Sequence, residues 1–519
     1  MRPGEGRSVI LFFLFAFLLL VAYYILKTLR EPLLLIHDQA EMKSYAYATI
    51  AGILLVLIPV YGFIFRRTRK SQLTRWVTTF FIANLGVFYV LGREGIDIGF
   101  AYYVWVGIVS LMLTVQFWGY AADTYNLKSG QRLFPVIMVG ATLGGLIGPL
   151  IAGGLYERIG PWNLMLLVGL LLAATLPLVK LARNAVPAGS RSTIATTAPK
   201  PHFMGGLAMV LQDRYLLMLA VLMVILNWVN TTGEYILAEF VVSYAKQRAE
   251  TDATLAKGDV IATFYSQFYF AVNALTLLIQ MLLVARIFRW IGVRGAVLVL
   301  PAIAFIGYGL IAFVPVFSII RVAKIAENST DYSLMNTTRH TLYLPLSDAH
   351  KFEGKTAVET FFWRLGDLIQ GGVIFIGLHW LNFVPRDFAL MNMLLAAIWF
   401  WVAIRLGRMY TGAADRHLSN EAPILTRSLV EQHAPAGQSF SFSLPFDAFT
   451  DPDPGDVLRI SATLSDGSPL PPWLRFDPEM LSFSGNAPDY VIGRTELAVR
   501  ATDFDGDSVS APLLLYHDP

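Results

Sequence analysis

The chain has 519 residues, of which 55% are hydrophobic and only 15% are charged. Water-soluble domains carry about 25% charged residues, so this composition excludes a purely soluble protein. The absence of cysteine excludes disulfides and thiolate metal sites. Apolar windows of about 20 residues, long enough to cross a bilayer, recur up to about residue 410 and then stop. We therefore expect a multi-pass domain in contact with the lipid bilayer, followed by a different module.

Twelve membrane spans are predicted, in two sets of six. The first set lies near 9–30, 45–65, 76–92, 99–122, 133–155 and 161–180; the second lies near 215–242, 260–285, 294–315, 316–337, 357–382 and 387–408. The polar segment 181–212 separates them as a central linker. This layout predicts two six-helix halves, 1–180 and 213–410, which is typical of transporters built from repeats. A second linker, 411–438, leads to a tail domain at 439–519.

Lysine and arginine are concentrated in loops that all fall on one side of these spans. The clusters lie at 66–75, 181–212, 286–294 and 405–410. Because short cytoplasmic loops are enriched in these residues, we expect a cytoplasmic N terminus in a bacterial inner membrane. An even number of spans predicts that the tail domain is cytoplasmic too.

The first span carries Lys27, Arg30 and Glu31 within "YYILKTLREP" (23–32). Cations at a helix end can extend to the lipid headgroups, which is one interpretation. The apolar "PLLLIH" that follows favours a second one, in which the charges lie within the hydrocarbon. Ionisable groups at that depth usually face a water-filled path.

The seventh span repeats the pattern with Asn230 and Glu234 in "LNWVNTTGEYIL" (226–237). Glu234 and Lys27 lie at similar depths in the first spans of the two halves. Two related halves would place these residues on opposite walls of one cavity. Hydrogen bonding between neighbouring helices is the alternative.

The tenth span contains a charged stripe. Arg321, Lys324, Glu327 and Asp331 fall within an arc of about 120° at helical spacing. Such a stripe is typical of a helix that lines an aqueous path, although an amphipathic helix at the membrane surface would also show it.

The eleventh span adds Arg364 and Asp367. Arginine binds phosphate and carboxylate groups in a bidentate manner, so we expect a small anionic solute as substrate. The acidic residues Glu31, Glu327 and Asp367 would pair with the cations in the empty site, or carry protons. The sequence contains no G-x-x-x-x-G-K-[ST] motif, so neither ATP hydrolysis nor another enzymatic activity is expected. No nucleic acid partner and no cofactor of the membrane domain are expected.

Four segments carry a resemblance that covers residues 9–408. They are "YYILKTLREPL", "FWGYAADTYNLKSGQRLFPVI" (117–137), "NTTGEYIL" (230–237) and "RHTLYLPLSDAHKFEGKTAVETFFWRLGD" (339–367). The chain resembles the nucleotide transporter branch of the major facilitator superfamily, the ATP:ADP antiporters and their bacterial relatives. The resemblance implies a twelve-helix transporter that exchanges nucleotides by alternating access. It also implies that Lys27, Arg30, Lys355 and Arg364 bind the substrate's charge.

The tail has a different pattern. Alternating segments such as "SFSFSLP", "LRISATL" and "TELAVRATD" predict a β-sandwich. With "LPPWLRFDP" and "ATDFDGD", the tail resembles the dystroglycan-type cadherin-like, or immunoglobulin-like, module. The resemblance implies a protein or glycan partner. An alternative function follows: a receptor, adhesion or scaffold protein whose transporter-like domain only anchors the sandwich.

Two acidic clusters in the tail suggest a calcium site. They comprise Asp451, Asp453, Asp456, Asp503, Asp505 and Asp507. Carboxylates at alternate positions suit Ca²⁺. Aspartate is also a common turn residue, so a purely structural role is the alternative.

Overall fold

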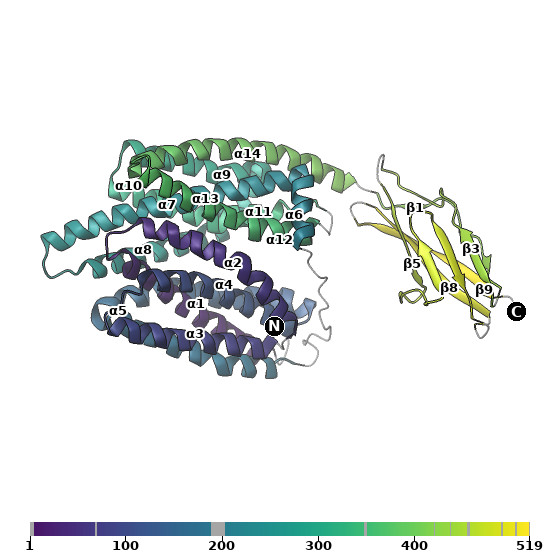
Figure 1. The fold of residues 1–519 in the computed structure, drawn as a ribbon, viewed down its shortest axis with the longest axis horizontal. Helices are drawn as coiled ribbons and strands as arrows, with labels where there is room; N and C mark the ends of the chain where they lie inside the picture. The colour runs from purple at the N-terminus through teal and green to yellow at the C-terminus, as the bar shows by residue number, and fades with distance from the viewer. Residues whose placement is uncertain are drawn as a thin grey trace. The chain divides into compact units, whose positions relative to one another are not determined.

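The computed structural model describes residues 5–67, 70–187, 203–346, 350–419, 421–435, 437–453, 457–488, 491, 493–503 and 506–517. The chain forms two compact units. One comprises Met1–Leu342 and Glu353–Arg408, and the other comprises Tyr343–Phe352 and Met409–Pro519. Figure 1 shows that the first unit is helical and that the second holds the strands.

The first half of the helical unit contains α1 (Gly6–Leu35), α2 (Glu41–Arg67), α3 (Lys70–Arg93), α4 (Gly99–Thr124) and α5 (Leu127–Asn184). A break at Gly160, with φ 76° and ψ 168°, divides α5 into two helical segments. Glycine adopts this conformation without steric cost, and Pro161 follows it. The buried face of α1, including Phe12, Phe15 and Ile25, packs into the hydrophobic core of this half.

The second half begins with α6 (Phe203–Gln212), α7 (Arg214–Thr251), α8 (Lys257–Leu278), the π-helix η2 (Ile279–Leu283) and α9 (Val284–Phe313). It continues with α10 (Phe317–Thr330), the π-helix η3 (Asp331–Met335), α11 (Asn336–Thr341), the π-helix η4 (His350–Gly354), α12 (Lys355–Ala357), the π-helix η5 (Val358–Phe362), α13 (Trp363–His379) and α14 (Pro385–Ser419). Gly292, with φ 64°, divides α9. The apolar α6 lies at the end of the predicted central linker, so that part of the linker is helical.

Nine helices of the described chain are long and apolar enough to cross a membrane. Two of these nine stretches contain the breaks at Gly160 and Gly292, and each of these two is long enough for two crossings. The segment from α10 through η3 to α11 is long enough to cross a membrane, but it is too polar to be identified as a span by its hydropathy. Together they give twelve helical segments, and each overlaps one of the predicted spans.

The two halves contact each other through a small set of helices. α2 packs against α13, and α8 packs against both α1 and α5. A Cβ atom added at Gly371 would lie 2.8 Å from Ala48 Cβ, so only glycine permits this approach of α13 to α2. Gln370 Nε2 also donates a hydrogen bond to Ser44 Oγ at 2.8 Å. Lys257 Nζ donates to the carbonyl of Ile36 at 2.9 Å, which joins the start of α8 to the end of α1.

The strand-containing unit is a sandwich. Its strands are β1 (Ile424–Leu425), β2 (Gln432–His433), β3 (Ser439–Ser443), β4 (Phe449–Thr450), β5 (Arg459–Leu464), β6 (Leu474–Asp477), β7 (Ser482–Asn486), β8 (Gly493–Thr502) and β9 (Ser508–His517). One sheet has the order β2-β9-β8-β5, a second has the order β3-β7-β6, and β1 pairs with β4. Alternate residues of β8 and β9 are buried, and Leu497 lies opposite Leu513 in the register. Phe483 of β7 is fully buried in the same core. β1 and β2 lie within the predicted second linker, so the sandwich begins earlier than the alternating pattern indicates.

Candidate substrate-binding site

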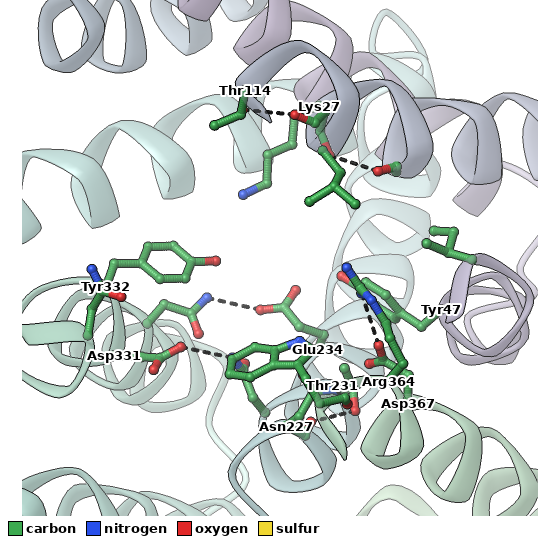
Figure 2. Close-up of a pocket in the computed structure, with 18 of the residues that line it drawn as sticks. Lys27, Tyr47, Thr114, Asn227, Thr231, Glu234, Asp331, Tyr332, Arg364 and Asp367 are labelled. Carbon is green, nitrogen blue, oxygen red and sulfur yellow. Dashed lines mark hydrogen bonds and ion pairs between the residues drawn. The ribbon is translucent and has the colours of Figure 1, made fainter. Parts of the chain in front are cut away.

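A cavity of about 570 Å³ lies between the two halves of the helical unit. α1, α2 and α4 supply one wall, and α7, α8, α10, η3, α11 and α13 supply the other. Its charged lining residues are Lys27, Arg30, Glu234, Asp331, Arg339, Arg364 and Asp367. Figure 2 shows Lys27 extending into the open space from one side, with Glu234 and Asp331 on the other.

Lys27 is held by aromatic rings. Its Nζ lies 4.4 Å from the ring centre of Tyr269, 5.5 Å from that of Tyr24 and 5.8 Å from that of Tyr332. A cation at this distance is attracted to the ring face. Among the described residues Lys27 has no carboxylate within 4.0 Å, and the residue is 9% exposed. The ammonium group is therefore available to an anion that enters the cavity.

Arg30 and Glu31 belong to a buried ion network. Arg30 Nε lies 3.2 Å from Glu31 Oε1, which also accepts a hydrogen bond from Tyr269 at 2.7 Å. The other oxygen of Glu31 lies 3.0 Å from Lys43 Nζ. Glu31 and Lys43 are fully buried, so this network fixes the orientation of Arg30 at the cavity wall.

Lys43 connects this network to the second half. Its Nζ lies 3.0 Å from Glu234 Oε2 and donates to Tyr265 at 3.3 Å. The other oxygen of Glu234 accepts a hydrogen bond from Asn328 at 3.0 Å and lies 4.0 Å from Lys324 Nζ. One buried ammonium group is thus shared by a carboxylate of each half.

Lys324 and Glu327 form a second buried pair behind the cavity wall. Their charged atoms lie 2.9 Å apart. Tyr308 lies 3.0 Å from both oxygens of Glu327, and Lys324 donates to Asn230 at 3.4 Å. The pair supports the wall that carries Asn230 and does not face the cavity itself.

Asp331 and Arg339 reach the cavity from a segment with an irregular helix. Asp331 begins η3, whose closing bond runs from Asn336 N–H to the Asp331 carbonyl, an i to i+5 pattern. This local unwinding changes the face on which later residues lie. Asp331 is 6% exposed and accepts one weak hydrogen bond, from Asn230 at 3.4 Å.

Arg339 lies over the ring of Trp363 at 5.0 Å and donates to Asn336 at 2.8 Å. Within the described chain neither Asp331 nor Arg339 has an oppositely charged group within 4.0 Å. Both charged groups therefore line the cavity without an ion-pair partner within 4.0 Å among the described residues.

Arg364 and Asp367 form a local pair on α13 with a separation of 3.3 Å. Asp367 is 2% exposed, whereas the Arg364 side chain remains 20% exposed at the cavity surface. Asn227 of α7 donates to the Trp363 carbonyl at 2.8 Å and holds α13 in place. Arg364 therefore retains free N–H donors on the cavity side.

The structure places the predicted substrate residues in three groups. Those that line the cavity are Lys27, Arg30, Asn230, Glu234, Arg364 and Asp367. Those buried directly behind it are Glu31, Lys324 and Glu327. Arg321 and Lys355 lie outside the lining. The expectation that Arg321 shares the cavity is wrong in this structure. Arg321 lies one turn before Lys324 on α10, and its guanidinium group contacts Gln267 and Phe264 of α8 instead.

Two cations of the site were not among the predicted binding residues. Lys43 lies just before the predicted second span, where a lysine is normally read as a headgroup contact. Arg339 lies just beyond the predicted tenth span, and only the π-helical segment brings it to the cavity. At regular helical spacing Arg339 falls about five turns after Arg321 and on the same side of the helix. Because Arg321 lies outside the cavity lining, a helical wheel gives no signal for Arg339.

The acidic residues of the tail act as turn-forming groups where the structure describes them. Asp451 Oδ1 accepts from the Asp453 N–H at 2.9 Å, and Asp503 Oδ1 accepts from the N–H groups of Gly506 and Asp507 at 2.7 and 2.8 Å. Asp456 and Asp505 lie outside the described residues. Within the described chain no group of three or more potential ligand side chains is placed to hold a metal ion. The calcium site stays a prediction.

Two helical halves that enclose one charged cavity form the fold of major-facilitator-type transporters. Solved structures of such transporters share the fold. A POT family transporter in complex with 5-aminolevulinic acid aligns with a TM-score of 0.57 at 13% identity, covering 80% of this chain and 98% of that one. The nucleoside transporter NupG aligns with a TM-score of 0.55 at 10% identity, covering 78% and 99%.

The chain belongs to the TLC ATP/ADP transporter family, whose model matches residues 100–410. ADP,ATP carrier protein 1 of Chlamydia muridarum is 21% identical over 380 residues, which cover 64% of this chain and 68% of that protein. ADP,ATP carrier protein 2 of Chlamydia trachomatis is 22% identical over 498 residues, covering 80% and 90%. The He_PIG model of Ig domains matches residues 422–515. The predicted fold class, a helical transporter domain with a C-terminal β-sandwich, is confirmed, as is the prediction of a membrane transporter.

Proposed function

We propose that this protein carries nucleotides across the membrane through the cavity between its halves, by exchange and with alternating access. The observation that carries the proposal is the pair Lys27 and Arg339. These two cations come from opposite halves, line the same cavity and lack a carboxylate within 4.0 Å among the described residues. Charge-assisted hydrogen bonds to phosphate are the strongest that such groups make.

The cavity also suits the remainder of a nucleotide. Its volume of about 570 Å³ lies within the range of about 300–1,000 Å³ that is usual for small-molecule sites. Aromatic side chains of Tyr47, Tyr269, Tyr332 and Trp363 line it and offer faces on which a base can stack. The amide groups of Asn227 and Asn328 offer hydrogen bonds to base or ribose.

Uptake into proteoliposomes tests the proposal. Purified full-length protein in vesicles preloaded with unlabelled adenine nucleotides should accumulate labelled nucleotide, and empty vesicles should accumulate much less. Lys27→Gln should lower uptake at least about tenfold, because it removes a charged partner of the phosphate. Lys180→Gln, which changes an exposed lysine on α5, is the matched control. If vesicles with folded protein accumulate no nucleotide, the proposal is wrong.

We also propose the location and orientation expected from the sequence: a bacterial inner membrane with both the N terminus and the β-sandwich in the cytoplasm. Twelve helical segments in the described chain support this arrangement, because an even number returns the chain to its starting side. A protease site placed after residue 519 should be protected in intact cells from which the outer membrane has been removed. Cleavage there would overturn the proposed orientation of the β-sandwich.

For the sandwich we propose a binding role with a protein or glycan partner. The complete two-sheet fold and its match to an Ig family support a binding module. Calcium remains part of this proposal. A calcium-dependent rise in the unfolding temperature of the sandwich, absent in Asp453→Asn, would support a bound ion, and identical unfolding in calcium and EGTA would exclude it.

A further inference from the structure

The charges around the cavity nearly cancel, and this balance restricts the charge of the substrate. In the part of the chain that the structure describes, the lining residues comprise four cations and three acids. The cations are Lys27, Arg30, Arg339 and Arg364, and the acids are Glu234, Asp331 and Asp367. The lining therefore has a net charge of +1.

The charged residues directly behind the lining do not change this total. Glu31 and Glu327 are balanced by Lys43 and Lys324, and all four are buried. Lys43 lies between Glu31 and Glu234, and Lys324 pairs with Glu327. Because each of these charges is compensated within 3.0 Å by a neighbour, none of them is free to balance a substrate.

Among the described lining residues, three charged groups have no oppositely charged group within 4.0 Å. Lys27 and Arg339 are positive, and Asp331 is negative, with one weak hydrogen bond from Asn230. Figure 2 shows Asp331 on the wall that faces Lys27. An anion drawn to the two cations must therefore also come near a carboxylate, which opposes each additional negative charge on the substrate.

In alternating access the cavity must close around its substrate. The summed charge of the lining and the substrate therefore determines which substrates the closed cavity can hold. Closing removes water, and an uncompensated charge in a closed site is strongly unfavourable. A phosphate monoester carries about −1.5 to −2 at neutral pH, and each further phosphate adds about one more negative charge. A nucleoside monophosphate would bring the closed site close to neutrality, whereas a free triphosphate would leave a large negative excess.

We infer that the site selects nucleotides of low net charge, and specifically a nucleoside monophosphate over free nucleoside di- and triphosphates. The inference rests on the proposed nucleotide transport and adds the substrate class. It also predicts an effect of magnesium, because Mg²⁺ binds the phosphates of a triphosphate and lowers its net charge.

Binding of AMP, ADP and ATP to the full chain in lipid nanodiscs tests this inference. In EDTA, AMP should bind at least about tenfold more tightly than ATP, and ADP should have an intermediate affinity. The reason is that one additional unit charge close to the lining charges changes the affinity by about tenfold. Adding Mg²⁺ should reduce the difference in affinity between AMP and ATP. If ATP binds in EDTA as tightly as AMP, the inference is wrong while the proposed function stands. If none of the three binds, the proposed function itself is wrong.

Altering the charge balance provides an independent test. Asp331→Asn raises the net charge by one and should raise the affinity for ATP relative to AMP by about tenfold. Glu94→Gln removes an exposed acid just after α3 and should leave the ratio unchanged. Arg339→Gln removes one positive charge and should lower the affinity for ATP relative to AMP. This variant provides the test if Asp331→Asn does not fold. Equal ratios in the parent chain and in the folded charge variants would overturn the inference.

Discussion

The Nζ atom of Lys43 lies 3.0 Å from Oε2 of Glu234, although α2 and α7 belong to different halves of the transporter. The same ammonium group lies 3.0 Å from Glu31 of α1. Two buried carboxylates, one in each half, therefore share a single cation. This contact stabilises the arrangement in which the halves meet through α2 and α13.

Lys43→Met should destabilise this arrangement by about 3–5 kcal/mol, because it leaves both carboxylates buried without their shared cation. Thermal unfolding of the purified chain measures the loss. Lys180→Met, which changes an exposed lysine, should have little effect. Adding Glu234→Gln to Lys43→Met should recover part of the loss, since one unpaired charge is then removed. Identical unfolding temperatures of Lys43→Met and Lys180→Met would mean that the shared ion pair contributes nothing to stability.

A disulfide between α2 and α13 should arrest transport. The parent chain has no cysteine, so Ala48→Cys combined with Gly371→Cys introduces the only pair. A Cβ at position 371 would lie within 2.8 Å of Ala48 Cβ, and disulfides join Cβ atoms about 3.8 Å apart, so a small shift suffices. Oxidation should stop uptake and reduction should restore it, if this contact opens during each cycle.

The neighbouring glycine supplies the control for that disulfide. A Cβ at Gly372 would have no atom within 4 Å, so Ala48→Cys with Gly372→Cys should neither cross-link nor lose uptake on oxidation. Full uptake by the cross-linked Ala48–Gly371 pair would show that α2 and α13 stay together throughout transport.

Gly233→Ala should disturb the site without changing any charge. The added Cβ would lie 1.9 Å from the Tyr308 hydroxyl and 2.6 Å from Lys324 Nζ. Overpacking of this kind costs about 1–3 kcal/mol, and here it would displace the groups that hold Glu327. We expect reduced nucleotide affinity and a lower unfolding temperature. Gly169→Ala, which places its Cβ in open space, should behave like the parent chain.

Phe483→Ala should unfold the sandwich selectively. Phe483 is fully buried between the two sheets, and truncation of a buried phenylalanine costs about 3–5 kcal/mol. Hydrogen exchange of β7 and its partners β3 and β6 in the full chain should accelerate. Met480→Ala, at a position that is 61% exposed, is the control. Unchanged exchange in Phe483→Ala would contradict the assigned core.

The segments that enter the membrane and those that form strands can be identified without any knowledge of the packing. The length of an apolar run and the alternation in segments such as "SFSFSLP" are local properties of the chain. The charged stripe in the segment 316–337 also predicts a helix that lines an aqueous path, and Asp331 of this segment lines the cavity. Lys27, Arg30, Glu234 and Arg364 could likewise be identified as charges at membrane depth.

Which of these charges meet depends on how the helices pack. Lys43 and Glu234 are 191 positions apart, and no pattern within a single helix indicates that they share a contact. The π-helical segment at Asp331 turns Arg339 toward the cavity, whereas Arg321, on the same predicted stripe, lies against α8 instead. The physical reason is that hydrophobicity is summed along a segment, but an ion pair depends on the angle and depth at which two segments pack.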